Sequence, residues 1–314
     1  MNGCRKKGRK KGISAVFLVF LGVVIFSGCV SRPGEPDWAG ILPGDYSVYF
    51  SMDRESARIL LPPVLDSHEN GSLEKYLKKV DRIFGGTRTS LDADLFGPVA
   101  PGDISLAVAG EFPRLLLSCA LGADKSWKKV RSSGNFWRND QGIEVAPVSS
   151  GMIYVSWGRM EELIRSYQAV RGEGNPGEGV LINRQILEKL YTGDLVITGT
   201  EWPFIDLPVR DGTIQSWTVV LDNTDSGLFR GSVSVSFGDE RNARFFAATL
   251  RLLSLGSFSG EAEPSLVEKL LALPVERNEN SVYFSGLELT GDELTGMFSG
   301  FLPQGQKTGD SESR

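Results

Sequence analysis

Cysteine and histidine are scarce in this chain of 314 residues. It has three cysteines and one histidine, His68, and neither Cys-x-x-Cys nor His-Glu-x-x-His occurs. The usual spacings of zinc ligands are therefore missing. Gly-x-Ser-x-Gly is missing as well, so no serine lies on the sharp turn that many serine hydrolases use. We expect His68, in the polar stretch 66–72, to be a solvated loop residue, and we predict no catalytic residue, no metal and no cofactor.

The start of the chain carries a basic head and an apolar run. Residues 5–11 supply six basic side chains, and the run from Ile13 ends in Phe26-Ser27-Gly28-Cys29. The most apolar part, from Ala15 to Phe26, has 12 residues, whereas a helix that crosses a membrane needs about 20. An ordinary cleaved signal would have small residues at the first and third positions before the cut. Gly28 meets this requirement and Phe26 does not.

This stretch resembles the signal of a bacterial lipoprotein precursor, in which a small residue precedes an obligatory cysteine. Gly28 and Cys29 fit that pattern, while Phe26 stands where leucine is usual. The resemblance implies cleavage between Gly28 and Cys29 and attachment of fatty chains to Cys29. Two or more chains hold a protein stably, because each buried methylene contributes about 0.8 kcal/mol. We therefore expect a lipid-anchored protein of the bacterial cell envelope, outside the cytoplasm.

The residue after Cys29 bears on which membrane holds the anchor. Val30, rather than aspartate, follows Cys29, and this favours the outer membrane over the outer leaflet of the inner membrane. Residues 29–37 then form a short tether of lipidated cysteine, proline, glycine and charged residues.

The exported part is acidic and has one free thiol. Removing residues 1–28 leaves 286 of the 314 residues, with 28 basic and 39 acidic side chains and a net charge of −11. Nucleic acid and anionic lipid surfaces are poor partners for such a body, because both require clustered Lys and Arg. Cys119 lies in the apolar run 115–121, and we expect it to be a buried packing residue rather than a nucleophile.

The exported part also reads as a duplication of one α+β unit. The sequence predicts a first half over 38–171, a glycine-rich linker over 172–185, a second half over 186–302 and a disordered tail over 303–314. Each half has the order strand, strand, strand, helix, hairpin, helix. The predicted fold class is thus two similar antiparallel-sheet halves, each with helices packed on one face.

The elements of each half follow from their periodicity. In the first half we predict strands over 44–51, 102–109 and 114–121, a short helix from 124, a hairpin over 142–157 and a helix over 159–170, with additional helices over 55–65 and 72–84. In the second half we predict strands over 193–200, 215–221 and 228–237, a helix over 239–255, a hairpin over 273–285 and a helix over 291–301.

Three further patterns favour structural explanations. Gly172-x-Gly174-x-x-Gly177 follows a predicted helix, not a strand, so it is a linker and not a dinucleotide site. For the acidic stretches 92–94 and 222–227, we favour turns over a calcium-binding site. The six tryptophans occupy positions that a core would use, and 136–140 is the most plausible exposed aromatic group.

The preferred interpretation is a non-enzymatic binding or structural module of unknown ligand, tethered through Cys29, with the bilayer and an envelope protein or glycan as partners. The alternative is a tethered hydrolase that acts on envelope glycan or peptide through carboxylates, which leave no local signature. A solute-binding lipoprotein would show parallel βαβ units, whereas this chain shows hairpins. A filled apolar contact between the halves would favour the module, and two carboxyls about 5–10 Å apart in a cleft would favour the hydrolase.

Overall fold

The computed structural model describes most of the chain from residue 42 to residue 299. The described residues are 42–64, 78–88, 104–132, 134–170, 182, 184–200, 202, 213–224, 227–255 and 265–299. The predicted signal with Gly28 and Cys29, the tether, most of the linker, the tail and His68 lie outside these residues. Asp92, Asp94 and Trp38 lie outside them as well.

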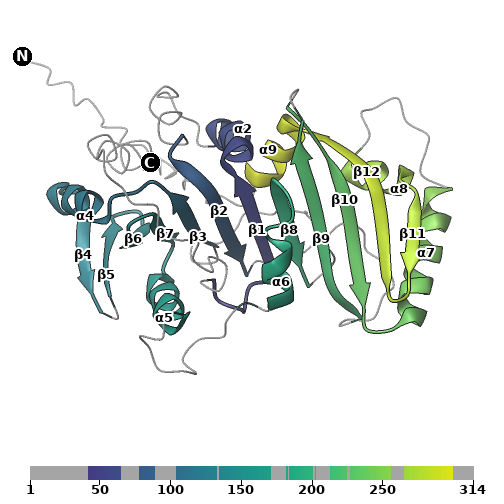
Figure 1. Cartoon of the computed structure of the whole chain (residues 1–314), viewed down its shortest axis with the longest axis horizontal. Helices are drawn as coiled ribbons and strands as arrows, with labels where there is room; N and C mark the ends of the chain where they lie inside the picture. The colour runs from purple at the N-terminus through teal and green to yellow at the C-terminus, as the bar shows by residue number, and fades with distance from the viewer. Residues whose placement is uncertain are drawn as a thin grey trace, which may run out of the picture.

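One antiparallel sheet of twelve strands runs through the whole molecule (Figure 1). Its strand order is β11-β12-β10-β9-β8-β1-β2-β3-β7-β6-β5-β4. The strands in chain order are β1 (Val48–Asp53), β2 (Val80–Thr87), β3 (Ile104–Gly110), β4 (Trp127–Arg131), β5 (Asn135–Asn139), β6 (Glu144–Ser149), β7 (Met152–Ser156), β8 (Leu195–Gly199), β9 (Ile214–Asn223), β10 (Leu228–Phe237), β11 (Val275–Asn278) and β12 (Ser281–Thr290).

The strand order is symmetric about the central pair β1–β8. Moving outward on either side, β2 corresponds to β9, β3 to β10, β7 to β12 and β6 to β11. The two halves of the chain therefore repeat one arrangement and join edge to edge through an antiparallel pair, with Phe50 opposite Ile197. The β4–β5 hairpin lies beyond β6 and has no counterpart beyond β11.

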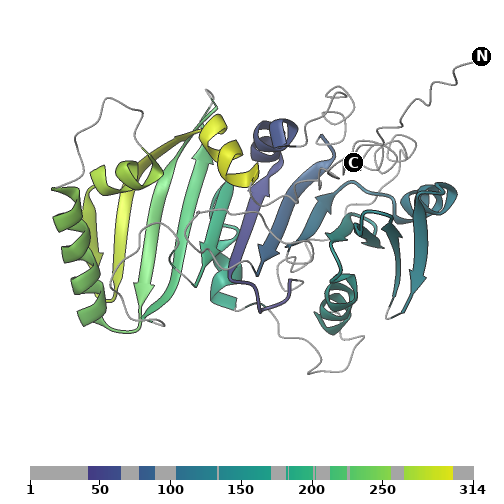
Figure 2. The ribbon, with the colours of Figure 1, turned by 180° about the vertical axis from the view of Figure 1, so that it is seen from behind.

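Helices cover the two sides of the sheet unequally (Figures 1 and 2). They are α2 (Arg54–Val64), α4 (Arg114–Ala123), α5 (Met160–Val170), α6 (Arg184–Lys189), α7 (Glu240–Ser254), α8 (Leu266–Ala272) and α9 (Gly291–Ser299). We call the side on which α2, α4, α7, α8 and α9 pack the α7 face, and the side on which α5 and α6 pack the α5 face. Among the described residues, no helix is both long enough and apolar enough to cross a bilayer.

Alternation along the strands divides the core between these two faces. Phe50 and Ile197 belong to the larger apolar cluster on the α7 face, whereas Tyr49 and Val196 belong to the smaller cluster on the α5 face. The contact between the halves is thus apolar on both sides of the sheet and closely filled. In the second half, the α5 face of β10 and β12 carries partly or fully exposed serines such as Ser232 and Ser285.

The predicted helix over 72–84 is wrong where it enters the described residues, because Val80–Thr87 is the strand β2. This segment pairs with β1 on one side and β3 on the other. Gly85 allows the ring of Phe50 to lie against the backbone, since a Cβ at Gly85 would be 2.1 Å from Phe50 Cζ. Strand pairing with β1 and β3 therefore outweighs the helical spacing of the apolar residues in this segment.

The predicted strand over 114–121 is also wrong: these residues form α4. A short apolar run fits a strand or a half-buried helix equally well, and here Leu117 and Leu121, four residues apart, face the core. Cys119 consequently lies on the outer side of α4 and is exposed, not buried.

The short helix predicted from Asp124 is a turn followed by the strand β4. The Asp124 carboxylate accepts hydrogen bonds from the backbone N–H and the hydroxyl of Ser126, at 2.9 and 2.8 Å. This turn ends α4 instead of starting a helix. The first half still has three strands before α4, as predicted. They are β1, β2 and β3, and β2 replaces the strand predicted over 114–121.

The other helices and strands predicted within the described residues are confirmed. Both hairpins, β6–β7 and β11–β12, form, and the helices α5 and α9 follow them. Helix α7 begins as expected after Asp239, whose side chain accepts a hydrogen bond from the backbone N–H of Asn242 at 2.8 Å. The fold class is the expected α+β arrangement of two similar antiparallel halves.

Candidate functional site: an apolar pocket under α8 and α9

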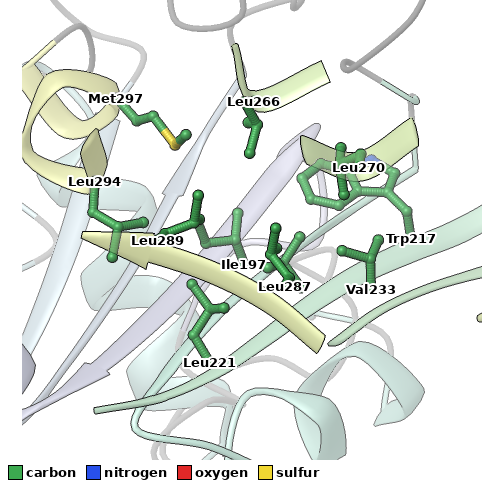
Figure 3. Close-up of a pocket in the computed structure, with 11 residues that line it drawn as sticks. Ile197, Trp217, Leu221, Val233, Leu266, Leu270, Leu287, Leu289, Leu294 and Met297 are labelled. Carbon is green, nitrogen blue, oxygen red and sulfur yellow. The ribbon is translucent and has the colours of Figure 1, made fainter. Parts of the chain in front are cut away.

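A small pocket lies on the α7 face of the second half, between the sheet and the helices α8 and α9 (Figure 3). Strands β8, β9, β10 and β12 form its floor, and the two helices form its roof. Eleven residues line it: Ile197, Trp217, Val219, Leu221, Val233, Leu266, Leu270, Leu287, Leu289, Leu294 and Met297.

The floor follows from strand alternation. Trp217, Val219 and Leu221 are every second residue of β9, and their side chains point to the same face. Leu287 and Leu289 repeat this spacing on β12. Strand β12 has a β-bulge opposite Gly231 and Ser232 of β10. The additional residue in the bulge places Leu287 and Leu289 on this face of the sheet.

The roof is built by two capped helix starts of the same kind. Ser265 and Glu268 form a capping box at the start of α8. At the start of α9, the Glu293 carboxylate accepts a hydrogen bond from the Thr290 backbone N–H at 2.8 Å, and the Thr290 hydroxyl accepts one from the Glu293 N–H at 3.3 Å. Both starts follow the pattern Ser/Thr-x-x-Glu, which satisfies N–H groups that the helix leaves free.

The pocket is small and enclosed by apolar atoms. Its volume is about 20 Å³, close to that of one water molecule, and a cavity with only apolar walls stays dry. Most lining side chains are fully buried, whereas Leu266 of α8 and Met297 of α9 are partly exposed. These two side chains come from the helices that roof the pocket (Figure 3).

One ion pair joins the two roof helices. Lys269 of α8 pairs with Glu293 of α9, and both side chains are partly exposed. Burial raises the pKa of Glu293, but hydrogen bonds from Lys269 and Thr290 outweigh this effect and hold the pKa below its ordinary value. The pair therefore stays charged at neutral pH.

The lining determines what this pocket can do. It has no carboxylate, amine, thiol, hydroxyl or imidazole, so it offers no group for acid–base or nucleophilic chemistry. A cavity of about 20 Å³ has room for no more than a methyl-sized group, so a longer apolar chain can enter only if α8 and α9 move away from the sheet. Met297, an adaptable side chain, lies on the α9 side of this pocket. In the described part of the chain, no group of three or more His, Cys, Asp or Glu side chains is placed to hold a metal ion.

Of the residues singled out from the sequence, Trp217 lines this pocket, and the others that the structure describes lie elsewhere. Phe136 and Trp137 are buried, with Trp137 only 4% exposed, so the packing interpretation of 136–140 is correct. Asp222 and Asn223 lie at the end of β9, and the Asn223 N–H donates to Asp194 Oδ2 at 3.0 Å. The capping patterns before 266 and 291 are the sequence signal that could have located the roof.

Comparisons with known proteins bear on the fold alone. No family model and no curated protein matches the chain. Solved structures of TP0453 are similar: crystal form IV has a TM-score of 0.53 at 10% sequence identity, covering 84% of this chain and 97% of that one. Crystal form III has a TM-score of 0.52 at 10% identity, with 86% and 99% covered. Crystal form I has a TM-score of 0.52 at 11% identity, with 86% and 98% covered.

Proposed function

We propose that this chain is a lipid-anchored protein of the bacterial envelope and a non-enzymatic binding module, which takes up an apolar chain when α8 and α9 move away from the sheet and widen the pocket beneath them. The observation that carries the binding role is the wholly apolar lining of that pocket. The filled contact between β1 and β8 supports a module over a hydrolase, because the junction of the halves holds packed side chains such as Phe50 and Ile197 instead of paired carboxyls.

The anchor rests on the leader and its junction. Gly28 and Cys29 supply the small residue and the cysteine that acylation requires, after a basic head and an apolar run. Attachment at Cys29 would hold the acidic body at a bilayer outside the cytoplasm, and the outer membrane is favoured by Val30. The partners we propose are the bilayer itself and an envelope protein or glycan.

Metabolic labelling with a palmitate analogue tests the anchor. The wild-type chain and a Cys119→Ala variant should both incorporate the label, because each keeps Cys29. A Cys29→Ala variant should lose it. Equal labelling of Cys29→Ala and Cys119→Ala would contradict the anchor.

Binding of cis-parinaric acid, a fluorescent fatty acid, tests the pocket. Val233→Ile adds one methylene to the floor of the pocket, and should weaken binding by about tenfold because a chain lying between β10 and the roof helices then has less room. Val275→Ile makes the same chemical change on β11, outside the lining, and should leave the affinity unchanged. Equal affinities for the two variants would show that the probe binds elsewhere.

A further inference from the structure

The outermost strand of the first half, β4, is an open edge of the sheet (Figure 1). It pairs with β5 on one side and with no strand of the described chain on the other. The β4–β5 hairpin is also the part of the sheet that breaks the symmetry between the halves. The fold thus adds two strands at this end of the sheet, and the outer side of β4 has no partner strand in the described chain.

The pairing pattern shows which backbone groups of β4 face outward. The N–H of Asn139 donates to Ile143 O at 3.0 Å, toward β6. In an antiparallel strand the direction alternates, so Phe136 and Arg138 form the hydrogen-bonded pairs with β4, opposite Val130 and Lys128. The N–H and C=O groups of Lys129 and Arg131 therefore point away from the sheet.

The same edge is basic in a protein that is otherwise acidic. Lys125, Lys128, Lys129 and Arg131 are all exposed within one turn and one strand. Lys128 pairs with Asp140 at 2.8 Å. Lys129 Nζ lies 5.4 Å from the centre of the Trp137 ring on the neighbouring strand β5, a cation–π contact. If the β4 edges of two copies of the chain paired with each other, their positive charges would repel, so this pairing is disfavoured.

The opposite edge is different. Strand β11 has only four residues and carries both signs of charge, in Glu276 and Arg277. Arg277 is held by Glu240 of α7 at 2.8 Å and by the carbonyl oxygen of Glu279 at 3.2 Å. Of the two ends of the sheet, β4 therefore offers the longer edge and one sign of charge.

We propose that the β4 edge binds an extended acidic segment of a partner protein as an additional strand. The backbone groups of Lys129 and Arg131 hydrogen-bond the segment, and acidic side chains at alternate positions lie beside the side chains of these two residues. This proposal rests on the proposed role as a binding module and names a partner class for it, at a site separate from the apolar pocket.

The test measures binding of labelled peptides to the detergent-solubilised full chain by fluorescence anisotropy. The probe is a peptide of alternating glutamate and valine, and the matched control is the same peptide with lysine for glutamate. The acidic peptide should bind at least about tenfold more tightly, with an affinity that falls as salt is added.

Two pairs of variants separate charge from strand addition. Arg131→Glu should weaken the acidic peptide by about tenfold or more, whereas Lys125→Glu, outside the strand, should have a much smaller effect. Lys129→Pro and Lys129→Thr both remove one charge, but only proline removes the outward N–H. Lys129→Pro should therefore bind at least about fivefold more weakly than Lys129→Thr.

Each contrary result overturns the proposal. Equal binding by Lys129→Pro and Lys129→Thr would mean that the edge attracts the peptide by charge alone. Equal effects of Arg131→Glu and Lys125→Glu would place the contact off β4, and binding of anionic vesicles in place of the peptide would assign the basic edge to a lipid surface. None of these outcomes changes fatty-acid binding or acyl labelling, which test the anchor and the pocket separately.

Discussion

Glu144 on β6 caps the start of α5: its Oε2 accepts a hydrogen bond from the backbone N–H of Met160 at 3.0 Å. The same oxygen accepts a second one from the Gly158 N–H at 3.0 Å, and Oε1 is bound by Arg138 Nε at 2.8 Å. The Glu144 side chain is only 1% exposed. A buried carboxylate is thus satisfied by a helix N-terminus and a guanidinium, and it fixes α5 on the α5 face.

Glu144→Ala should lower the free energy of unfolding by about 3 kcal/mol, because it leaves the two N–H groups and Arg138 without their shared acceptor. Urea denaturation followed by tryptophan fluorescence measures the change. Glu161→Ala removes an exposed carboxylate from the first turn of the same helix and should cost less than about 1 kcal/mol. Similar losses for both variants would show that Glu144 acts only through the helix dipole.

Arg82 joins the two halves across the sheet. This side chain of β2 donates from Nη1 to Leu190 O at 3.0 Å and from Nη2 to Gly193 O at 3.1 Å, just after α6. Lysine cannot reach both carbonyl oxygens with a planar fork. Arg82→Lys should therefore destabilise the protein by about 1–2 kcal/mol in the same denaturation experiment.

Arg230→Lys is the matched control for Arg82→Lys, because Arg230 forms an exposed pair with Glu288. An exposed pair of this kind is worth about 0–1 kcal/mol, so this variant should unfold close to the wild type. If the two variants were equally stable, the fork of Arg82 would contribute nothing to the junction.

Two glycine-to-alanine changes should act in opposite directions. A Cβ at Gly85 on β2 would meet the Phe50 ring at 2.1 Å, whereas a Cβ at Gly122 on α4 meets no atom within 4 Å. Gly85→Ala should destabilise by about 1–3 kcal/mol, because the buried ring must move. Gly122→Ala should stabilise by about 0.5–1 kcal/mol, since alanine favours a helix. Thermal unfolding compares the two, and a stable Gly85→Ala would mean that Phe50 has free space.

These positions also show how far the sequence could predict the fold. Long alternating strands such as Leu228–Phe237 and the capped helix after Asp239 are encoded locally, so both are predicted correctly. The segment Val80–Thr87 becomes a strand through pairing with β1 and β3. That pairing joins residues far apart in the sequence, and no local pattern reports it.

The candidate site escapes prediction for a similar reason. The floor and the roof of the pocket come from β8, β9, β10, β12, α8 and α9, and every one of the lining side chains is an ordinary core residue by itself. Only the tertiary arrangement leaves a gap between Val233 and Leu270. Cys119 shows the reverse case, because the helix α4 exposes a thiol that an apolar run suggests is buried.

Acid should loosen the roof of the pocket through Glu293. The pKa of this carboxyl in the folded protein lies below its ordinary value because Lys269 and Thr290 hydrogen-bond the charged form and outweigh the effect of burial. A carboxyl with a lowered pKa stabilises the fold fully above its unfolded pKa, about 4.3. This contribution is lost as the pH falls through the lower pKa of the folded state.

The expected result is weaker protection of the backbone amides against exchange, measured relative to the intrinsic rate at each pH, in α8 and in the first turn of α9 at pH values below about 4. In Glu293→Gln this protection should be weak already at neutral pH and should change less with acid, because no charge is left to titrate against Lys269. Glu268→Gln is the matched control. Hydrogen bonds from the backbone N–H and side chain of Ser265 also lower the pKa of Glu268, but that carboxylate caps α8 alone and does not reach α9. Acid should still weaken the protection of α9 in Glu268→Gln, and a loss of that acid response would assign the effect to the α8 cap instead of the Lys269–Glu293 pair.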